Sequence, residues 1–228
     1  MFIQHELNPE NFNPDKHRIF ALQANNPFGD IYSSSTKMFH CRYGSAEYMK
    51  ENFAEVESFC RIAHNNAVQI KVNRNPFYDQ LIILNASSNF FDFFNYTLLS
   101  PNKQTVLETK NDIAISKELA IKYFGDEMPI GNSIKITFND EAKEFLVSGV
   151  FEKPLNATQL NFDMVTLFEG ERDSRCYVKL NSASSRQKME KAFELLKDEI
   201  PVIKGDSSNQ YSLLPLNEAY YSAIRKSR

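Results

Sequence analysis

The chain has 228 residues, enough for one large or two small domains, and its 42% hydrophobic and 24% charged residues exclude a largely disordered protein. The formal net charge is -3 and the basic residues are scattered, which excludes the concentrated positive surface of a nucleic-acid-binding protein. No apolar run approaches the ~20 residues of a membrane-spanning helix, so the sequence predicts a soluble piece whose core is rich in Phe and Tyr.

The first part of the chain predicts strands around one amphipathic helix. Residues 18–23 are dense in apolar and aromatic side chains, which is typical of a strand. Residues 68–72 and 81–84 predict two further strands, separated by an Asn-Arg-Asn-Pro turn. Residues 45–62 predict a helix with Ser45 as its N-cap, because apolar side chains recur at helical spacing: Met49, Phe53, Val56 and Cys60.

The middle of the chain predicts a second set of elements. Residues 89–96 carry a cluster of Phe and Tyr that must be buried or form an interface. Residues 116–124 predict a short helix with Gly125 as a left-handed C-cap, and residues 133–138 and 143–151 predict strands. The side chains expected on one side of that helix are Leu119, Ala120, Tyr123 and Phe124.

The last part of the chain predicts a strand, a helix and a strand. Residues 175–180 and 211–216 have the composition of strands. Between them, residues 184–199 predict a helix with Ser184 as its N-cap, which Pro201 ends. The apolar positions of this helix are Met189, Ala192, Phe193 and Leu196.

This order of elements predicts an α+β (mixed α/β) fold with two subdomains. The two outer parts of the chain each contain strand, helix and strand, so we expect residues 14–86 plus 170–228 to form one βαβ-type layer. We expect residues 87–169 to form a second subdomain that is inserted between the two halves of the first.

The stretch KYFGDEMPIGNSIKI, residues 122–136, raises the question of a phosphate or metal site. A phosphate site needs its glycines before a helix, where free N–H groups point at the anion, whereas Gly125 follows one. A calcium loop needs alternating acids, but here two adjacent acids are followed by no third until Asp140. We therefore predict a structural corner, in which Pro129 stiffens the turn and Gly131 lets the backbone enter the next strand.

No constellation in the sequence predicts catalysis, a cofactor or a metal site. Ser45 lacks the second glycine of a nucleophile elbow, and His40 and Cys41, as neighbours in an extended chain, point to opposite sides. The cysteines are too far apart for a zinc site or a disulfide scaffold, so we expect small buried apolar residues and leave their disulfide state open: Cys41, Cys60 and Cys176. The histidines are not spaced as ligands: His5, His17, His40 and His64.

Three motifs in order resemble the MacB-type periplasmic core domain of ABC transporter permeases, in the FtsX-like permease family, as found in Bacteroidetes. They are NFFDFF at residues 89–94, ISKELAIKYFGDEMPIG at residues 115–131 and VSGVF at residues 147–151. Residues 11–20 and 214–216 extend the resemblance to most of the chain. The residues that match the family signature, for which we expect a structural role, are Phe90, Phe91, Phe124, Gly125, Pro129, Ile130, Gly131, Gly149 and Val150.

The resemblance implies a domain between the first two membrane helices of a permease, on the periplasmic side of the bacterial cytoplasmic membrane. It implies a porter-like subdomain from the chain's ends and a second, Sabre-like subdomain from its middle. The ends of the sequence carry no targeting or terminating motif, which we expect of an excised domain. The implied partners are the permease's own transmembrane helices, a cytoplasmic ATPase domain or subunit, an unidentified periplasmic partner or substrate and, as one option, a second copy.

The expected function is non-catalytic: the domain transmits ATP-driven movement of the membrane helices to an external partner or substrate. An alternative is a ligand-sensing or substrate-binding module, with its site between the subdomains, which the aromatic cluster at residues 90–96 motivates. A secreted hydrolase is a third alternative and rests only on the abundance of carboxylates.

Overall fold

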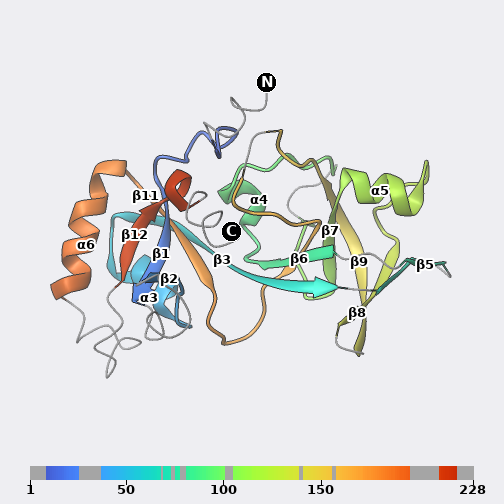
Figure 1. The fold of residues 1–228 in the computed structure, drawn as a ribbon, viewed down its shortest axis with the longest axis horizontal. Coiled ribbons are helices and arrows are strands. Elements are labelled where there is room, and N and C mark those ends of the chain that lie inside the picture. The colour runs from blue at the N-terminus through green and yellow to red at the C-terminus, as the bar shows by residue number, and fades with distance from the viewer. Residues whose placement is uncertain are drawn as a thin grey trace. The chain divides into compact units, whose positions relative to one another are not determined.

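The protein forms two compact units, shown here in a computed structural model (Figure 1). The first unit comprises Met1–Arg61 and Gly170–Arg228, and the second comprises Ile62–Glu169. Both units combine sheet and helix, which confirms the predicted α+β class. The structure describes residues 9–25, 37–67, 69–72, 75–77, 81–100, 105–138, 141–155, 158–195 and 211–219.

The sheet of the first unit is built around β1 (Ile19–Asn25). This strand pairs antiparallel with β11 (Arg175–Leu180), with β12 (Ser212–Pro215) and with the short β2 (Lys37–Phe39). On its other edge β11 neighbours β3 (Val56–Ala67), which continues from the first unit into the second. Strands from both ends of the sequence therefore share one sheet.

Two helices cover this sheet with apolar side chains. They are α3 (Ser45–Asn52) and α6 (Arg186–Leu195), the latter preceded by the 3-10 turn η2 (Ala183–Ser185) (Figure 1). Every second residue of β1, from Phe20 to Ala24, faces the same core. The helical side chains in this core are Ala46, Met49, Ala192, Met189 and Phe193.

The sheet of the second unit begins at the second half of β3. There β6 (Leu81–Ala86) pairs antiparallel with β3 and parallel with β10 (Met164–Leu167). Next, β10 pairs antiparallel with β7 (Asp112–Ser116), which is buried along its whole length. A strand buried on both faces is the expected centre of such a sheet.

The remaining strands of the second unit follow from β7 towards the other edge. Strand β9 (Glu141–Phe151) pairs parallel with β7 and antiparallel with β8 (Ser133–Phe138). Strand β4 (Gln69–Val72) pairs with β8, and β5 (Asn75–Phe77) pairs with β4 at the edge. The apolar side chains of these strands form a core with helix α5 (Lys117–Phe124), to which Ile134, Ile136 and Val147 belong.

The predicted aromatic cluster is buried in the second unit. It surrounds the short helix α4 (Phe90–Phe93), and the Phe90 ring lies 5.4 Å from the rings of Tyr96 and Phe162. Phe91 contacts Phe151 of β9 at 5.6 Å between ring centroids. Of the two outcomes that the sequence allowed for this cluster, burial is the one found.

The helix predicted over residues 45–62 is wrong in its second half. Helix α3 ends at Asn52, and β3 begins at Val56. The misleading signal is the spacing of four between Val56 and Cys60, because four residues also equal two periods of a strand. Pairing with neighbouring strands decides between the two structures, and Ile62 is buried as a continuation of the strand pattern.

The two predicted serine caps are also wrong. Gly44, with φ 82°, holds the N-cap of α3, and Ser45 lies inside the helix with its Oγ 3.1 Å from the Tyr211 hydroxyl. The later helix begins as η2, where Ser182 rather than Ser184 supplies the capping oxygen. The predicted positions Leu196 and Pro201 lie outside the described residues.

The compact second unit begins at Ile62, whereas the sequence placed the start of the inserted subdomain at residue 87. Strands β4, β5 and β6, which precede that residue, pair with strands of the middle of the chain or with one another. The second unit ends at Glu169. No helix in the described ranges is both long and apolar enough to span a membrane.

Candidate functional site

The corner predicted at residues 122–136 is where the structure forms an open apolar pocket. Helix α5 enters it with Ser116 as N-cap, whose Oγ accepts the Leu119 N–H at 3.3 Å. The predicted buried face of the helix is confirmed. Its last N–H bond runs from Gly125 to the Ile121 carbonyl at 2.9 Å.

Glycine at position 125 is required by the backbone. Gly125 has φ 59° and ψ -120°, so it has positive φ as predicted but lies outside the left-handed helical region. This combination is open almost only to glycine, and no atom lies within 4 Å of where a Cβ would stand. The residue is therefore needed for its conformation and not for a close approach.

Hydrogen bonds hold the rest of the corner against β9. Gly131 has φ 87° and donates its N–H to the Val147 carbonyl at 2.9 Å. The Asn132 N–H donates to the Pro129 carbonyl at 3.1 Å, and the Asn132 side-chain amide donates to the Met128 carbonyl at 2.7 Å. The turn thus uses its own polar groups to fix its shape.

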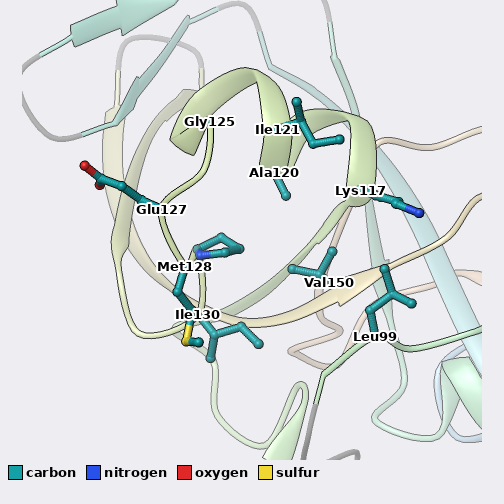
Figure 2. A pocket seen from close by; sticks show the side chains of 10 residues that line it. Leu99, Lys117, Ala120, Ile121, Gly125, Glu127, Met128, Ile130 and Val150 are labelled. Carbon is teal, nitrogen blue, oxygen red and sulfur yellow. The ribbon is translucent and has the colours of Figure 1, made fainter.

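Between this turn and α5 lies a pocket of about 370 Å³, which we call the corner pocket (Figure 2). Val150 of β9 and Leu99, whose N–H donates to the Val150 carbonyl at 2.8 Å, form its lower wall. The lining residues are Leu99, Lys117, Ala120, Ile121, Gly125, Glu127, Met128, Pro129, Ile130 and Val150.

The corner pocket gathers exposed apolar side chains. Met128 is 75% exposed, Ile121 is 62% exposed and Leu99 is 46% exposed. Among the residues that the structure describes, only Tyr43, Leu146 and Leu155 are further large apolar or aromatic side chains with comparable exposure. Three of these six exposed side chains therefore line one pocket, whereas exposed apolar residues without a function are usually scattered singly over a surface.

Two charged side chains stand at opposite sides of the opening (Figure 2). Lys117 donates from Nζ to Glu152 Oε1 at 2.8 Å, and this bond raises the pKa of Lys117. Within the described ranges, the exposed carboxylates of Asp126 and Glu127 form no ion pair. The turn side of the pocket therefore carries uncompensated negative charge.

The nine residues of the family signature fall into several places. Four of them, Gly125, Pro129, Ile130 and Val150, line the corner pocket. Phe124 and Gly131 belong to the same corner, Phe124 on the buried face of α5. The others lie in the adjacent core: Phe90, Phe91 and Gly149.

Sequence reasoning did not predict the corner pocket. Ile121 was the available signal, because it lies outside the buried stripe of an otherwise amphipathic helix. Met128 gives no local signal, since an apolar residue in a turn is ordinary.

The described His and Cys residues that were weighed for chemistry are not gathered into a metal site, and His5 lies outside the described residues. In the parts of the chain that the structure describes, no group of three or more His, Cys, Asp or Glu is placed to hold a metal ion. The Nε2 atom of His40 lies 3.4 Å from Oδ2 of Asp173. The neighbouring Cys41 is buried, and its thiol donates to the Arg42 carbonyl at 3.5 Å.

All three cysteines are buried, as predicted for small apolar residues, and none of them forms a disulfide in the described part of the chain. Although distant in sequence, Cys41 and Cys176 interact in the core of the first unit, and the antiparallel bridge between Cys41 and Ser174 brings their strands together. Burial, followed by a hydrogen bond with Cys41, raises the pKa of the Cys176 thiol. A protonated, buried thiol is a poor nucleophile.

The comparisons with known proteins agree with the motifs. A family model for the MacB-like periplasmic core domain matches residues 8–196. The comparison with curated proteins gave no match. Among solved structures, a domain assigned to a permease of Porphyromonas gingivalis is similar with a TM-score of 0.71 and 18% identity, over 89% of this chain and 91% of that chain.

Two further solved structures share the fold. The periplasmic region of MacB from Actinobacillus actinomycetemcomitans has a TM-score of 0.62 and 15% identity, over 92% of this chain and 94% of its own. The extracellular domain of the noncanonic ABC-type transporter YknZ from Gram-positive bacteria has a TM-score of 0.59 and 15% identity, over 86% and 99%. Because the family model spans most of the sequence, the chain belongs to the MacB-like periplasmic core domain family, the periplasmic domains of MacB- and FtsX-like ABC transporter permeases.

Proposed function

We propose that this domain transmits ATP-driven movement of permease membrane helices to a partner or substrate outside the cytoplasmic membrane. The match to the MacB-like periplasmic core domain over residues 8–196 carries the proposal. The domain has no catalytic role of its own in this proposal. ATP is hydrolysed by a cytoplasmic ATPase domain or subunit, and the membrane helices of the permease connect the two.

The packing of each unit suits this role. In the second unit, aromatic rings contact one another at 5.1 to 5.6 Å around Phe90, Phe151 and Phe162. In the first unit, β1 is held between β11 and β12. Close-packed interiors of this kind transmit displacement and do not absorb it. In this proposal two copies of the permease act together, and the first unit, Met1–Arg61 and Gly170–Arg228, corresponds to the porter-like subdomain expected over residues 14–86 plus 170–228.

A ligand-sensing module is less well supported. Its motivation was an exposed aromatic cluster at residues 90–96, and every Phe and Tyr of that cluster is buried. The pKa of Asp15 and that of Glu55 are lowered, whereas a general acid needs a raised pKa, so these two carboxylates give a hydrolase no support.

Distances between labels on two external domains test the proposal directly. The full-length permease and its ATPase are reconstituted in lipid nanodiscs, with single spin labels at Leu155→Cys or Lys191→Cys. Both positions are exposed, whereas the native cysteines are buried and remain unlabelled. We expect the distance distribution between the two copies to shift when ATP is added.

The matched control is an ATPase variant that binds ATP and does not hydrolyse it, measured before and after a chase with ADP. A distance distribution that is the same with ATP, with ADP and without nucleotide at both label positions would reject force transmission.

A further inference from the structure

The corner pocket is an apolar surface for which force transmission provides no use. It belongs to the second unit alone and lies between α5, the turn after it and β9 (Figure 2). We propose that it is a docking site for a protein partner, which inserts a large apolar side chain into the pocket and places a Lys or Arg beside it. This proposal does not depend on whether the domain transmits movement.

The shape of the corner pocket fits a side-chain anchor. Its volume of about 370 Å³ lies near the lower end of the range of ~300 to 1,000 Å³ for ligand pockets. Ala120 and Val150 are nearly buried at its base, while Ile121, Leu99 and Met128 are exposed around it. An anchor that covers these three side chains removes a large apolar area from water, as central anchors do in protein interfaces.

The walls of the pocket are largely formed before any partner binds. Ser116 caps α5, and the Gly131 N–H ties the turn to Val147 of β9. The carbonyl of Met128 is held by the Asn132 side chain at 2.7 Å. A preorganised pocket lowers the entropic cost of binding, while the flexible Met128 side chain adapts to the shape of the anchor.

The charges around the pocket select a basic partner. On the turn side, the carboxylates of Asp126 and Glu127 have no ion-pair partner among the described residues. On the other side, the charge of Lys117 is balanced by Glu152. Lys122, the other base of α5, is not among the residues that line the pocket and lies over the Tyr123 ring at 5.9 Å. The rim is therefore acidic, and a Lys or Arg next to the apolar anchor complements it.

The same charge argues against a lipid occupant. Anionic headgroups, which dominate the charge of bacterial membranes, are repelled by an acidic rim. The pocket is also compact, whereas a long acyl chain needs an extended apolar channel. A polypeptide segment suits both the compact apolar pocket and the acidic rim, because it can place a basic side chain next to an apolar one.

Selection of peptides on the domain tests the proposal. A phage library of random linear peptides is panned on the immobilised 228-residue chain at low salt. We expect the enriched peptides to share a Leu, Met, Phe or Ile next to a Lys or Arg. Their synthetic versions are then titrated by fluorescence anisotropy against the wild type and against Ile121→Gln and Met128→Gln, which remove apolar surface at exposed positions.

For a peptide that uses the pocket, each of these two substitutions should raise Kd at least about tenfold, because it removes the contact of a central anchor. The matched control is Leu155→Gln, since Leu155 is 88% exposed and lies outside the pocket. It should leave Kd unchanged. Glu127→Lys should weaken binding of peptides with a basic neighbour, and added salt should reduce that effect.

Several results would overturn the proposal. One is the absence of any enriched peptide that distinguishes the wild type from both pocket variants. Another is a set of enriched peptides whose binding depends on the pocket but which show no preference for Lys or Arg. A third is that the pocket substitutions abolish self-association of the domain, measured by sedimentation velocity, because the occupant would then be a second copy. A fourth is that they abolish binding of the domain to phosphatidylglycerol vesicles, measured by flotation, because the occupant would then be a membrane. None of these results affects the label distances that test force transmission.

Discussion

At Gly149 the backbone of β9 passes against a buried side chain. A Cβ at this position would lie 2.8 Å from Val106 Cγ1 and 3.2 Å from the Ser100 hydroxyl, which accepts the Val150 N–H at 2.9 Å. Contacts below 3.0 Å force a shift of the neighbouring atoms. Gly149 therefore serves close packing, in contrast to Gly125, where the backbone angles demand glycine.

We expect Gly149→Ala to lower the free energy of unfolding by about 1–3 kcal/mol, because the added methyl overpacks the space next to Val106. Urea denaturation measures the loss. In a Val106→Ala background the same substitution should cost less, since the space that the methyl needs is then open. Equal costs in the two backgrounds would show that the contact with Val106 is not the cause.

The carboxyl group of Asp15 gives the first unit a pH dependence. It accepts hydrogen bonds from Lys179 Nζ at 2.9 Å and from the Arg18 guanidinium at 2.8 Å. The bond from Lys179 and then that from Arg18 hold the pKa of Asp15 below its ordinary value of 3.8. The folded state thus keeps this carboxylate ionised at a pH where the unfolded chain binds a proton.

The stabilisation from Asp15 is therefore complete above its unfolded pKa and is lost as the pH falls through the lower, folded pKa. We expect Asp15→Asn to cost about 0.5–1 kcal/mol near neutral pH, the size typical of a partly exposed ion pair. Urea denaturation at several pH values and constant ionic strength measures the difference from the wild type. The difference should shrink below pH 3.8, and a difference that stays constant would contradict this origin.

Arg61 joins three elements of the first unit. From β3, its guanidinium donates to Glu47 Oε1 of α3 at 3.1 Å, to the Arg172 carbonyl at 2.8 Å and to Ser174 Oγ at 3.4 Å. It also lies over the Tyr43 ring at 5.3 Å. Since its side chain is only 9% exposed, these bonds replace the water that the charge has lost.

We expect Arg61→Ala to destabilise the protein by about 2–4 kcal/mol, because partly buried acceptors lose a charged donor. Arg61→Lys should recover only part of this loss, since an ammonium cannot reproduce the planar fork. Arg172→Ala is the control, because Arg61 binds its backbone carbonyl, which remains. Thermal unfolding compares the three variants, and equal effects of Arg61→Ala and Arg172→Ala would disprove the role of the guanidinium.

Elements whose apolar residues fit only the repeat of a helix or only that of a strand were predicted well. Strand β8 alternates exposed and buried residues and was predicted at its observed limits, and α5 has a capping serine before its buried stripe and a glycine after it. Strand β3 was missed, because the spacing of its apolar residues also satisfies a helix. Local sequence does not separate these alternatives, whereas pairing with β11 and β6 does.

For the whole molecule, the two compact units differ in how the chain builds them. All strand partners of β4 to β10 lie between residues 62 and 169. In the first unit, by contrast, β1 depends on β11 and β12, which follow Gly170. The second unit is thus continuous in sequence, and the first is completed only after the second has been synthesised.

We expect a chain of residues 62–169 to fold by itself and to show a cooperative urea transition, because it keeps its complete core. Residues 1–61 alone should remain unfolded, because β1 then lacks β11 and β12 and keeps only the short strand β2. Circular dichroism and NMR dispersion measure both fragments. A folded fragment of residues 1–61, or an unfolded fragment of residues 62–169, would refute this division.

The sequence by itself determined the family, the α+β class and the glycine corner, because motifs, alternation and helix caps are local properties of the chain. Only the tertiary structure decided that the second unit starts at Ile62, that distant cysteines meet and that Ile121, Met128 and Leu99 line one pocket. Each of these depends on which strands pair and which side chains remain uncovered. Such contacts join residues far apart in the chain, so no local pattern records them.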